Sequence, residues 1–405
     1  MKQEPIVIVG GGHAAAQLCA SLHERGMASR VQLISAEPEL PYQRPPLSKS
    51  YLKDTAEVAQ VIRAKTWFDQ AGVQCHLGTR VVHIDRSNQH VVLDNGQSIP
   101  YGSLVLATGT RARQWSMLPH GMSNACSLRT VQDANVIRSQ LAEATNIVVL
   151  GGGFIGLEVA ATARALGKNV VLLEMAPRLM GRSVSAELAA HVTSVHVANG
   201  IDVRLNARVD SVHTEQDRIT RLTLGNETLN VDFLLIASGA EPEVGLGMES
   251  GLVCDNGILV DAGMETSDPC VFAIGDCVSF PLSNQRRIRL ESVQNANDQA
   301  RLLAARLAGD EVTYHPVPWF WSEQGNMRLQ MVGLMPSHAK TCRRDGANTN
   351  SFSLFHYDGD HLACVESVNA PIDHMTARKF LEGGLSPTPD QVSNASIALK
   401  TWLSS

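Results

Sequence analysis

The pattern of apolar and polar positions repeats one supersecondary unit twice along the chain. Residues 5–37 and 146–174 each run from an apolar strand through a glycine-rich turn and an alanine-rich helix into a second apolar strand. Short apolar runs joined by such a helix are typical of parallel βαβ units. The pattern therefore predicts an α/β fold with two separate parallel sheets.

Later segments extend both sheets. Each unit is followed downstream by an apolar strand that ends in a hydroxyl residue and glycine, at residues 104–109 and 234–239. A third short apolar strand, residues 271–276, ends in Gly-Asp, and an amphipathic helix is predicted to follow at about residues 292–308. We expect this third segment to return to the first domain.

The pattern changes after Pro318. A strand is predicted at residues 328–334, a hairpin at 351–368 that turns at 358–360, and a helix near 373–381. These elements predict a separate C-terminal α+β domain.

Composition narrows the class of protein. The chain has 405 residues, 44% of them hydrophobic and 18% charged, which suffices for two or three packed domains. Its longest apolar stretch, residues 147–163, contains three consecutive glycines and Glu158, so it predicts no membrane span, and the N-terminus has no signal-peptide core. These features predict a cytoplasmic protein.

Charge and cysteine spacing exclude further classes. The net charge of −6 argues against nucleic acid as a partner. The eight cysteines form no C-x-x-C pair, so neither a metal site nor a redox-active dithiol is predicted from its usual spacing.

The first glycine turn, Gly10 to Ala15, fits the dinucleotide-binding pattern G-x-G-x-x-A. Its glycines allow a tight turn and a close approach to a pyrophosphate at a helix N-terminus. The second strand of this unit ends in Ser35, so the nearest carboxylate, Glu37, is the candidate for the ribose hydroxyls, with a solvated loop glutamate as the alternative.

The second turn is the more complete fingerprint, with Gly151, Gly153 and Gly156 in the pattern G-x-G-x-x-G and Glu174 directly after the second strand. A carboxylate at that position accepts hydrogen bonds from ribose hydroxyls, one of which NADPH replaces by a phosphate. The turn therefore predicts NADH. Arg178 is the residue that would favour NADPH.

This doubled arrangement resembles the pyridine-nucleotide-dependent flavoprotein reductases, in which FAD uses the first site and the nicotinamide cofactor the second. Four segments, residues 41–49, 153–158, 291–296 and 318–322, resemble the NADH-dependent ferredoxin reductases of Rieske-type oxygenase and bacterial haem-monooxygenase systems. The resemblance covers roughly residues 5–385. It implies that a hydride passes from NADH to FAD, and that single electrons then pass to a small iron–sulfur ferredoxin, with no protein nucleophile.

The resemblance also implies three domains and a set of site residues. An FAD domain is expected at residues 1–112 and 247–316, an NAD domain at 113–246 and a C-terminal domain at 317–405. The FAD site is expected to contain Gly10, Gly12, His13, Ala14, Ala15, Glu37, Arg44, Lys49, Val82, Ala107, Thr108, Gly109, Arg129, Gly275, Asp276, Ser292, Val293 and Trp321. The NAD site is expected to contain Gly151, Gly153, Phe154, Ile155, Gly156, Glu158, Glu174, Ser238 and Gly239.

Several of these residues have roles implied by the resemblance. Arg129 is expected at the FAD phosphates and Asp276 at the ribityl chain. The helix that begins at Ser292 and Val293 is expected to point at the flavin pyrimidine carbonyl. Trp321 is expected against the isoalloxazine ring, although the sequence alone equally allows a packed aromatic side chain.

Lys49 and Glu158 are the candidate catalytic pair. Glu158 lies in an otherwise apolar helix start, where an unpaired carboxylate is costly, so it needs a cation. In similar reductases this pair lies beside nicotinamide and flavin. The alternative is a structural ion pair.

Two other functions remain possible from the sequence. A disulfide reductase or thiol-dependent peroxidase of the same superfamily would need a cysteine near residues 47–49, where there is none. A redox-responsive signalling protein resembling apoptosis-inducing factor shares the Pro-Tyr-x-Arg-Pro-Pro-Leu-Ser-Lys motif but would be expected to carry a basic excess. For ferredoxin docking, the candidates are the local arginines Arg286, Arg287, Arg343 and Arg344.

Overall fold

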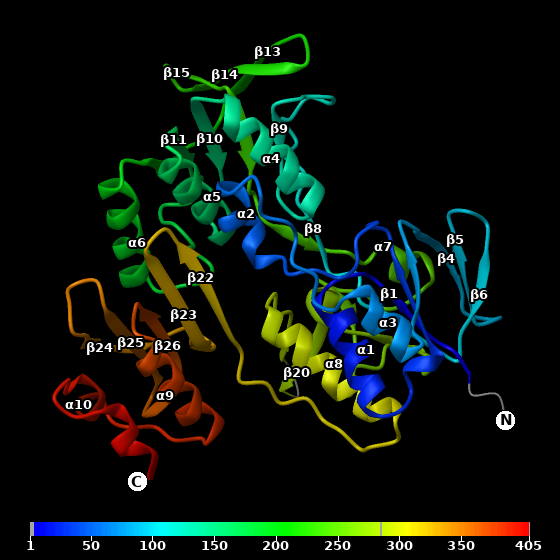
Figure 1. Cartoon of the computed structure of the whole chain (residues 1–405). Helices are drawn as coiled ribbons and strands as arrows, with labels where there is room; N and C mark the ends of the chain where they lie inside the picture. The colour runs from blue at the N-terminus through cyan, green and yellow to red at the C-terminus, as the bar shows by residue number, and fades with distance from the viewer. Residues whose placement is uncertain (1–3, 284–285, 405) are drawn as a thin grey trace. The chain divides into compact units, whose positions relative to one another are not determined.

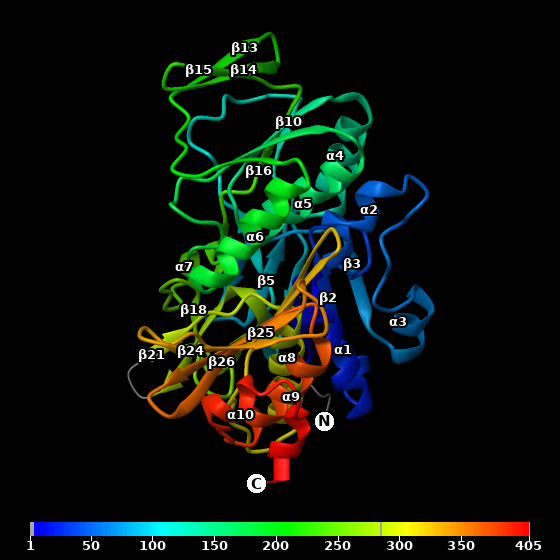
Figure 2. The ribbon, with the colours of Figure 1, turned by 90° about the vertical axis from the view of Figure 1, so that its left-hand side faces the viewer.

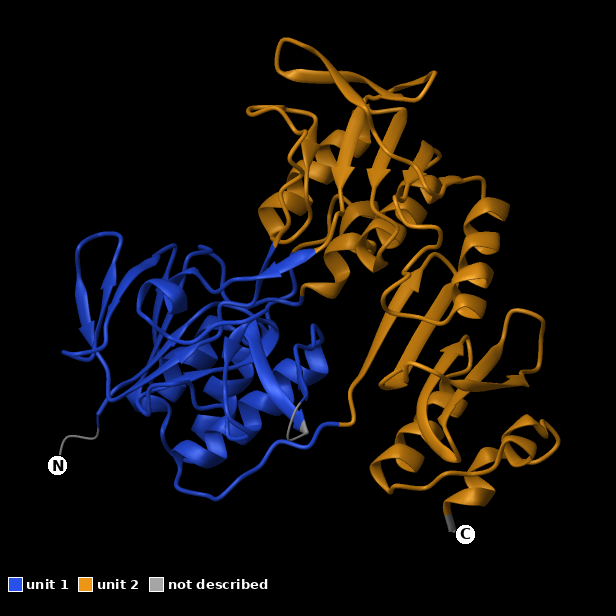
Figure 3. Cartoon of the chain, turned by 180° about the vertical axis from the view of Figure 1, so that it is seen from behind, with its two compact units in different colours: residues 1–43, 59–111, 240–316 blue, residues 44–58, 112–239, 317–405 orange. Residues whose placement is uncertain are grey.

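The computed structural model describes residues 4–283 and 286–404 (Figure 1). The chain divides into two compact units, shown in Figure 3. Unit 1 contains Met1–Gln43, Ala59–Arg111 and Ala240–Pro316, and unit 2 contains Arg44–Val58, Ala112–Gly239 and Val317–Ser405. Among the described residues, no helix combines the length and the apolar character that a membrane crossing requires.

Unit 1 is built on a parallel five-stranded sheet of order β19-β7-β1-β2-β3. Its strands are β1 (Ile6–Val9), β2 (Val31–Ser35), β3 (Gln74–Leu77), β7 (Ser103–Leu106) and β19 (Val271–Ala273). Ile6, Val7 and Ile8 of the central strand are fully buried, as expected for a sheet covered on both faces. Val271 pairs with Leu104, which confirms that the Gly-Asp segment returns to the first domain.

Helices and smaller sheets complete unit 1. Helices α1 (His13–Glu24) and α8 (Val293–Leu307) lie side by side (Figures 1 and 2). The remaining elements are α3 (Lys65–Ala71), α7 (Gly245–Glu249), an antiparallel sheet of β4 (Val81–Asp85), β5 (His90–Leu93) and β6 (Ser98–Pro100), a ladder of β8 (Thr110–Ala112) and β17 (Ala240–Pro242), and a sheet of β18 (Ile258–Leu259), β20 (Val278–Ser283) and β21 (Arg286–Ile288).

Unit 2 contains the second parallel sheet, of order β12-β11-β10-β16-β9. Its strands are β9 (Ala125–Cys126), β10 (Asn146–Leu150), β11 (Asn169–Leu173), β12 (Asp202–Arg204) and β16 (Phe233–Ile236). Around it lie α2 (Ser50–Lys53), α4 (Val131–Glu143), α5 (Phe154–Ala165), α6 (Ala186–Ala198) and an antiparallel sheet of β13 (Ser211–Glu215), β14 (Arg218–Leu224) and β15 (Glu227–Asn230).

The C-terminal part of unit 2 is an antiparallel sheet of order β22-β23-β26-β25-β24 with helices α9 (Pro371–Glu382) and α10 (Pro389–Ser393). Its strands are β22 (Trp319–Gln324), β23 (Met327–Gly333), β24 (Lys340–Asp345), β25 (Phe352–Asp358) and β26 (His361–Val368). Asp358 pairs with His361, so the predicted hairpin and its turn are confirmed. The predicted α+β character of this region is confirmed as well.

Candidate functional site

The first glycine turn places the end of β1 against the end of β7. Gly10 has φ +127°, and a Cβ at this residue would lie 2.1 Å from the carbonyl oxygen of Ala107, so only glycine fits. Gly12 caps α1 with extended backbone, and a Cβ there would have no protein atom within 4 Å. The space at the N-terminus of α1 is thus open where a pyrophosphate would bind, so the turn fits a dinucleotide.

The second glycine turn repeats this geometry. Gly151 has φ +106°, and a Cβ there would lie 2.3 Å from the carbonyl oxygen of Ala237. The space at Gly153 is again open, with no protein atom within 4 Å of a Cβ. A Cβ at Gly156 would lie 2.1 Å from the Gly151 carbonyl oxygen, so α5 packs directly on the turn. This turn also fits a dinucleotide, and it lies beside Ser238, as the two strand ends predict.

Glu174 is bonded to the second turn itself. Its Oε2 accepts from the backbone N–H of Gly152 at 2.7 Å, and its Oε1 accepts from that of Ala176 at 2.7 Å. Each oxygen keeps a lone pair for a ribose hydroxyl. Arg178, the residue that would favour NADPH, donates to the carbonyl oxygens of Val184 and Gly181 at 2.9 and 2.6 Å. Its guanidinium is therefore held by the backbone.

Glu37 has a different environment. Its backbone N–H donates to Ser35 Oγ at 3.2 Å, and its carboxylate accepts a hydrogen bond from the Tyr42 hydroxyl. Tyr42 is 1% exposed, so this bond holds Glu37 from the buried side. Sequence reasoning did not identify Tyr42, because a tyrosine within a proline-rich loop carries no spacing signal.

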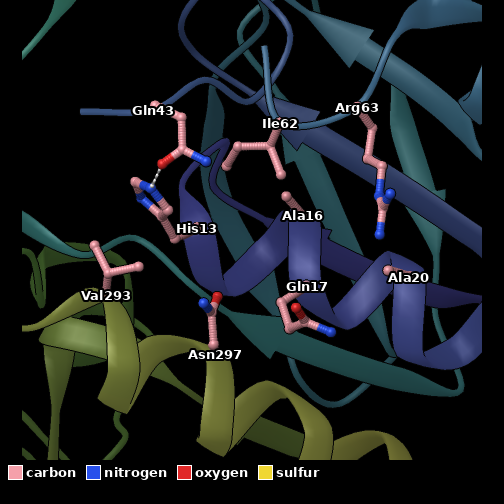
Figure 4. A pocket seen from close by; sticks show the side chains of 9 residues that line it. All are labelled: His13, Ala16, Gln17, Ala20, Gln43, Ile62, Arg63, Val293 and Asn297. Carbon is pink, nitrogen blue, oxygen red and sulfur yellow. Dashed lines mark hydrogen bonds between the residues drawn. The ribbon is translucent and has the colours of Figure 1, made fainter. Parts of the chain in front are cut away.

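A pocket of about 190 Å³ lies beside α1 and the start of α8 (Figure 4). It brings together two of the predicted FAD residues, His13 and Val293, and His13 Nε2 is hydrogen-bonded to Gln43 Oε1 at 2.9 Å. The sequence did not single out the other lining residues, which are Ala16, Gln17, Ala20, Gln43, Ile62, Arg63 and Asn297.

Two other predicted FAD positions of unit 1, the Gly-Asp segment and Ser292, lie at the starts of the same helices. A Cβ at Gly275 would lie 3.2 Å from that of Ala14, so the Gly-Asp segment lies against the start of α1. Ser292 caps α8 by accepting from the N–H of Asn295 at 3.1 Å, which confirms where this helix begins. Val82 lies on β4 with its side chain 44% exposed.

Four predicted FAD residues, Arg44, Lys49, Arg129 and Trp321, belong to unit 2. Arg44 Nη1 donates to the carbonyl oxygen of Arg129 at 2.8 Å, so these two arginines are neighbours. Trp321 lies on β22, its ring 5.7 Å from that of Trp319. The Arg129 backbone N–H donates to Asp133, the residue that closes the N-terminal capping box of α4.

Lys49 and Glu158 form the predicted ion pair. Lys49 Nζ lies 2.7 Å from Glu158 Oε2, and the two side chains are 18% and 5% exposed. Two hydroxyls that the sequence did not suggest complete the coordination of the carboxylate: Ser48 donates to Oε2, and Ser322 donates to Oε1 at 2.7 Å. Three donors thus compensate this buried charge.

The docking hypothesis for the arginines is wrong at Arg344. This side chain is 7% exposed and donates to the carbonyl oxygens of Val392, Asn394 and Ile397. Neighbouring residues of a strand point to opposite faces, and Arg344 points to the buried one. Arg343 is paired with Asp345 and Glu187, so its charge is compensated. The Arg287 guanidinium donates to two backbone carbonyl oxygens, which hold it against the protein.

Known proteins resemble the chain over nearly its whole length. Residues 4–300 match the family model described as pyridine nucleotide-disulphide oxidoreductase, and residues 319–403 match that described as reductase C-terminal. Rhodocoxin reductase of Rhodococcus erythropolis is 39% identical over 98% of this chain and 93% of its own length.

Solved structures agree. The ferredoxin reductase for the CYP199A2 system from Rhodopseudomonas palustris superposes with a TM-score of 0.95 at 40% identity, covering 98% of this chain and 99% of the other. The covalent putidaredoxin reductase–putidaredoxin complex superposes with a TM-score of 0.93 at 34% identity, covering 99% of this chain and 98% of the other. The chain therefore belongs to the pyridine nucleotide-disulphide oxidoreductase family, and within it to the FAD-containing, NAD(H)-dependent ferredoxin reductases.

Proposed function

We propose that the protein oxidises NADH in the cytoplasm and delivers single electrons to a [2Fe–2S] ferredoxin that serves an oxygenase. Bound FAD supplies the conversion, because a flavin accepts two electrons as a hydride and releases them one at a time. The protein's own residues bind the two dinucleotides, orient them and compensate charge.

The observation that carries this proposal is the pair of open glycine turns in one chain. Hydride transfer between two dinucleotides requires two such sites, and the helix starts at Gly12 and Gly153 both leave the space that a pyrophosphate needs. We assign FAD to the turn of unit 1 and NADH to the turn of unit 2. The expected domains, 1–112 with 247–316, 113–246 and 317–405, form part of the proposal.

Charged residues have distinct roles in this scheme. Glu174 orients the adenosine ribose of NADH, and Lys49 with Glu158 lies beside the reacting rings. Helix α8 is 15 residues long, and its N-terminus stabilises negative charge on the reduced flavin. Such a helix end contributes about 0.3–1 kcal/mol in exposed settings.

Relatives support a small redox protein as the acceptor. Rhodocoxin reductase, terpredoxin reductase and putidaredoxin reductase are each named for an acceptor, and a solved complex joins the last of these to putidaredoxin. The acceptor of this chain is accordingly proposed to be a ferredoxin encoded separately.

Anaerobic reduction of a ferredoxin panel tests the function. The purified protein with FAD is mixed with NADH and one ferredoxin at a time, and loss of the cluster's visible absorbance is followed. At least one ferredoxin should be reduced at many turnovers per second, with NADPH far less effective as donor. Reduction of a disulfide substrate with no ferredoxin turnover would instead support the thiol-reductase alternative.

A further inference from the structure

The carboxylate of Glu158 is held by a residue from the C-terminal sheet. Ser322 on β22 donates to Oε1 at 2.7 Å, whereas Lys49 and Ser48 donate to Oε2. Ser322 is 1% exposed, so no water competes with its hydroxyl. The two carboxylate oxygens therefore have separate partners, and rotation of the carboxylate would break bonds on both sides.

A second layer of hydrogen bonds fixes Ser322. Gln324 Nε2 lies 3.2 Å from Ser322 Oγ, and Gln324 Oε1 lies 2.8 Å from His196 Nε2. Gln324 and His196 are each 1% exposed. With the amide nitrogen directed at Ser322, the amide oxygen accepts from His196, so each hydrogen is donated in the direction of Glu158. Burial lowers the pKa of His196, which agrees with a neutral imidazole that donates from Nε2.

The strand that carries these residues is attached to the helix of the second glycine turn. Phe320, Ser322 and Gln324 occupy alternate positions of β22 and therefore share one face. Phe320 makes an edge-to-face contact with Phe154, the first residue of α5, at a centroid distance of 4.7 Å. One strand face thus contacts both the start of α5 and its only carboxylate.

We propose that Ser322, supported by Gln324, is a positioning residue that holds Glu158, and through it Lys49, in the orientation used for flavin reduction by NADH. The inference rests on the proposed function. Removing the hydroxyl leaves a buried carboxylate oxygen without its donor, and the carboxylate then turns toward the remaining donors and displaces Lys49. Hydrogen bonds to charged groups are strong enough for the loss to lower the reduction rate roughly tenfold.

Ser322→Ala tests this positioning role, with Ser353→Ala as the matched control. Ser353 lies in the same sheet, is fully buried and bonds Ser367 and Asp373. The rate of stopped-flow flavin reduction at saturating NADH should fall about tenfold in Ser322→Ala. The dependence of this rate on pH should also differ from that of the wild type. Calorimetric NAD⁺ binding and FAD content should stay close to wild type. Ser353→Ala should alter only the unfolding temperature.

Gln324→Leu provides a second, independent variant. It should slow reduction about threefold, and the double variant should be no slower than Ser322→Ala, because both changes act through one hydrogen-bond chain. Additive effects, or an unchanged reduction rate in Ser322→Ala, would overturn the positioning role while leaving the proposed function intact. If Ser322→Ala does not fold, an unchanged rate in Gln324→Leu would overturn it. A wild-type protein that NADH does not reduce would overturn the proposed function itself.

Discussion

The two glycine turns share a backbone and differ in the side chains beneath them. In both, the first glycine donates to a carbonyl oxygen at the end of the neighbouring strand, Gly10 to Ile34 and Gly151 to Leu173. The residues that follow these two, Ser35 and Glu174, therefore occupy equivalent positions. The second turn is tied to its acid by the Gly152 N–H, whereas the first turn has only the Ser35 hydroxyl at that place, with Glu37 two residues further on. Equal fingerprints therefore do not imply equal ribose ligands.

A second difference lies five residues into each helix. Glu158 of α5 is charged, 5% exposed and paired with Lys49, and the equivalent residue of α1 is Gln17, which donates to Ser21 and lines the pocket. A buried ion pair is costly to maintain, so its presence at only one turn points to a task that this turn performs alone. In the proposed function that task is hydride transfer.

Substitutions that place a side chain in one turn or the other should have the largest effect on cofactor binding. Gly12→Val and Gly153→Val place a side chain in open space, at backbone angles that valine adopts, so both variants should fold. Gly12→Val should purify without FAD. Gly153→Val should stay yellow but lose NADH reduction by at least about a hundredfold.

Visible absorbance and stopped-flow reduction distinguish these outcomes, and each variant is the control for the other. Loss of FAD from Gly153→Val with retention by Gly12→Val would reverse the assignment of the two cofactors.

Lys49→Ala should have the next largest effect on flavin reduction, because it removes the cation that pairs with Glu158, and only the second turn has such an ion pair. The Glu158 carboxylate would keep two hydroxyl donors but no cation, and breaking such a pair costs about 3–5 kcal/mol. Flavin reduction by NADH should slow by about a hundredfold, with FAD retained. The control is Lys53→Ala, which changes an exposed lysine on α2, the short helix that Lys49 caps. An unchanged reduction rate would leave the pair a structural one.

Glu174→Ala tests the strand-end difference through donor selectivity. The 2′-phosphate of NADPH would bring negative charge against a carboxylate and remove a hydroxyl donor, so the wild type should prefer NADH by a factor of hundreds, or roughly 3–4 kcal/mol. The substitution should lower this preference mainly by weakening NADH.

Glu174→Gln keeps one acceptor oxygen and separates charge from hydrogen bonding. Steady-state kcat/KM with both donors is the measurement, and Glu37→Ala is the control that should leave the ratio unchanged. Equal use of both donors by the wild type would contradict the role of Glu174.

Local sequence predicted the features that depend on neighbouring residues. The turns, the hairpin at residues 351–368 and the need of Glu158 for a cation all follow from short patterns. Ser322 could not be predicted, since it reaches Glu158 across 164 residues and a serine next to tryptophan has no distinctive spacing. Arg344 was misjudged for the related reason that charge clusters in sequence do not reveal which face of a strand is buried.

The smallest effect is expected at Glu37, the candidate ribose ligand of the first turn. If its carboxylate accepts from a ribose hydroxyl of FAD, Glu37→Ala should weaken FAD roughly tenfold, since one charge-assisted bond is lost. Tyr42→Phe removes the hydroxyl that holds this carboxylate in place and keeps the buried ring, so it should weaken FAD by only a few fold. Fluorescence titration of the apoprotein with FAD measures both changes. The double variant should bind no worse than Glu37→Ala, because Tyr42 acts through Glu37. An FAD affinity that is unchanged in Glu37→Ala would show that the first turn holds its ribose without a carboxylate. The two turns would then differ in the kind of group that binds the ribose, with a carboxylate, Glu174, only at the second.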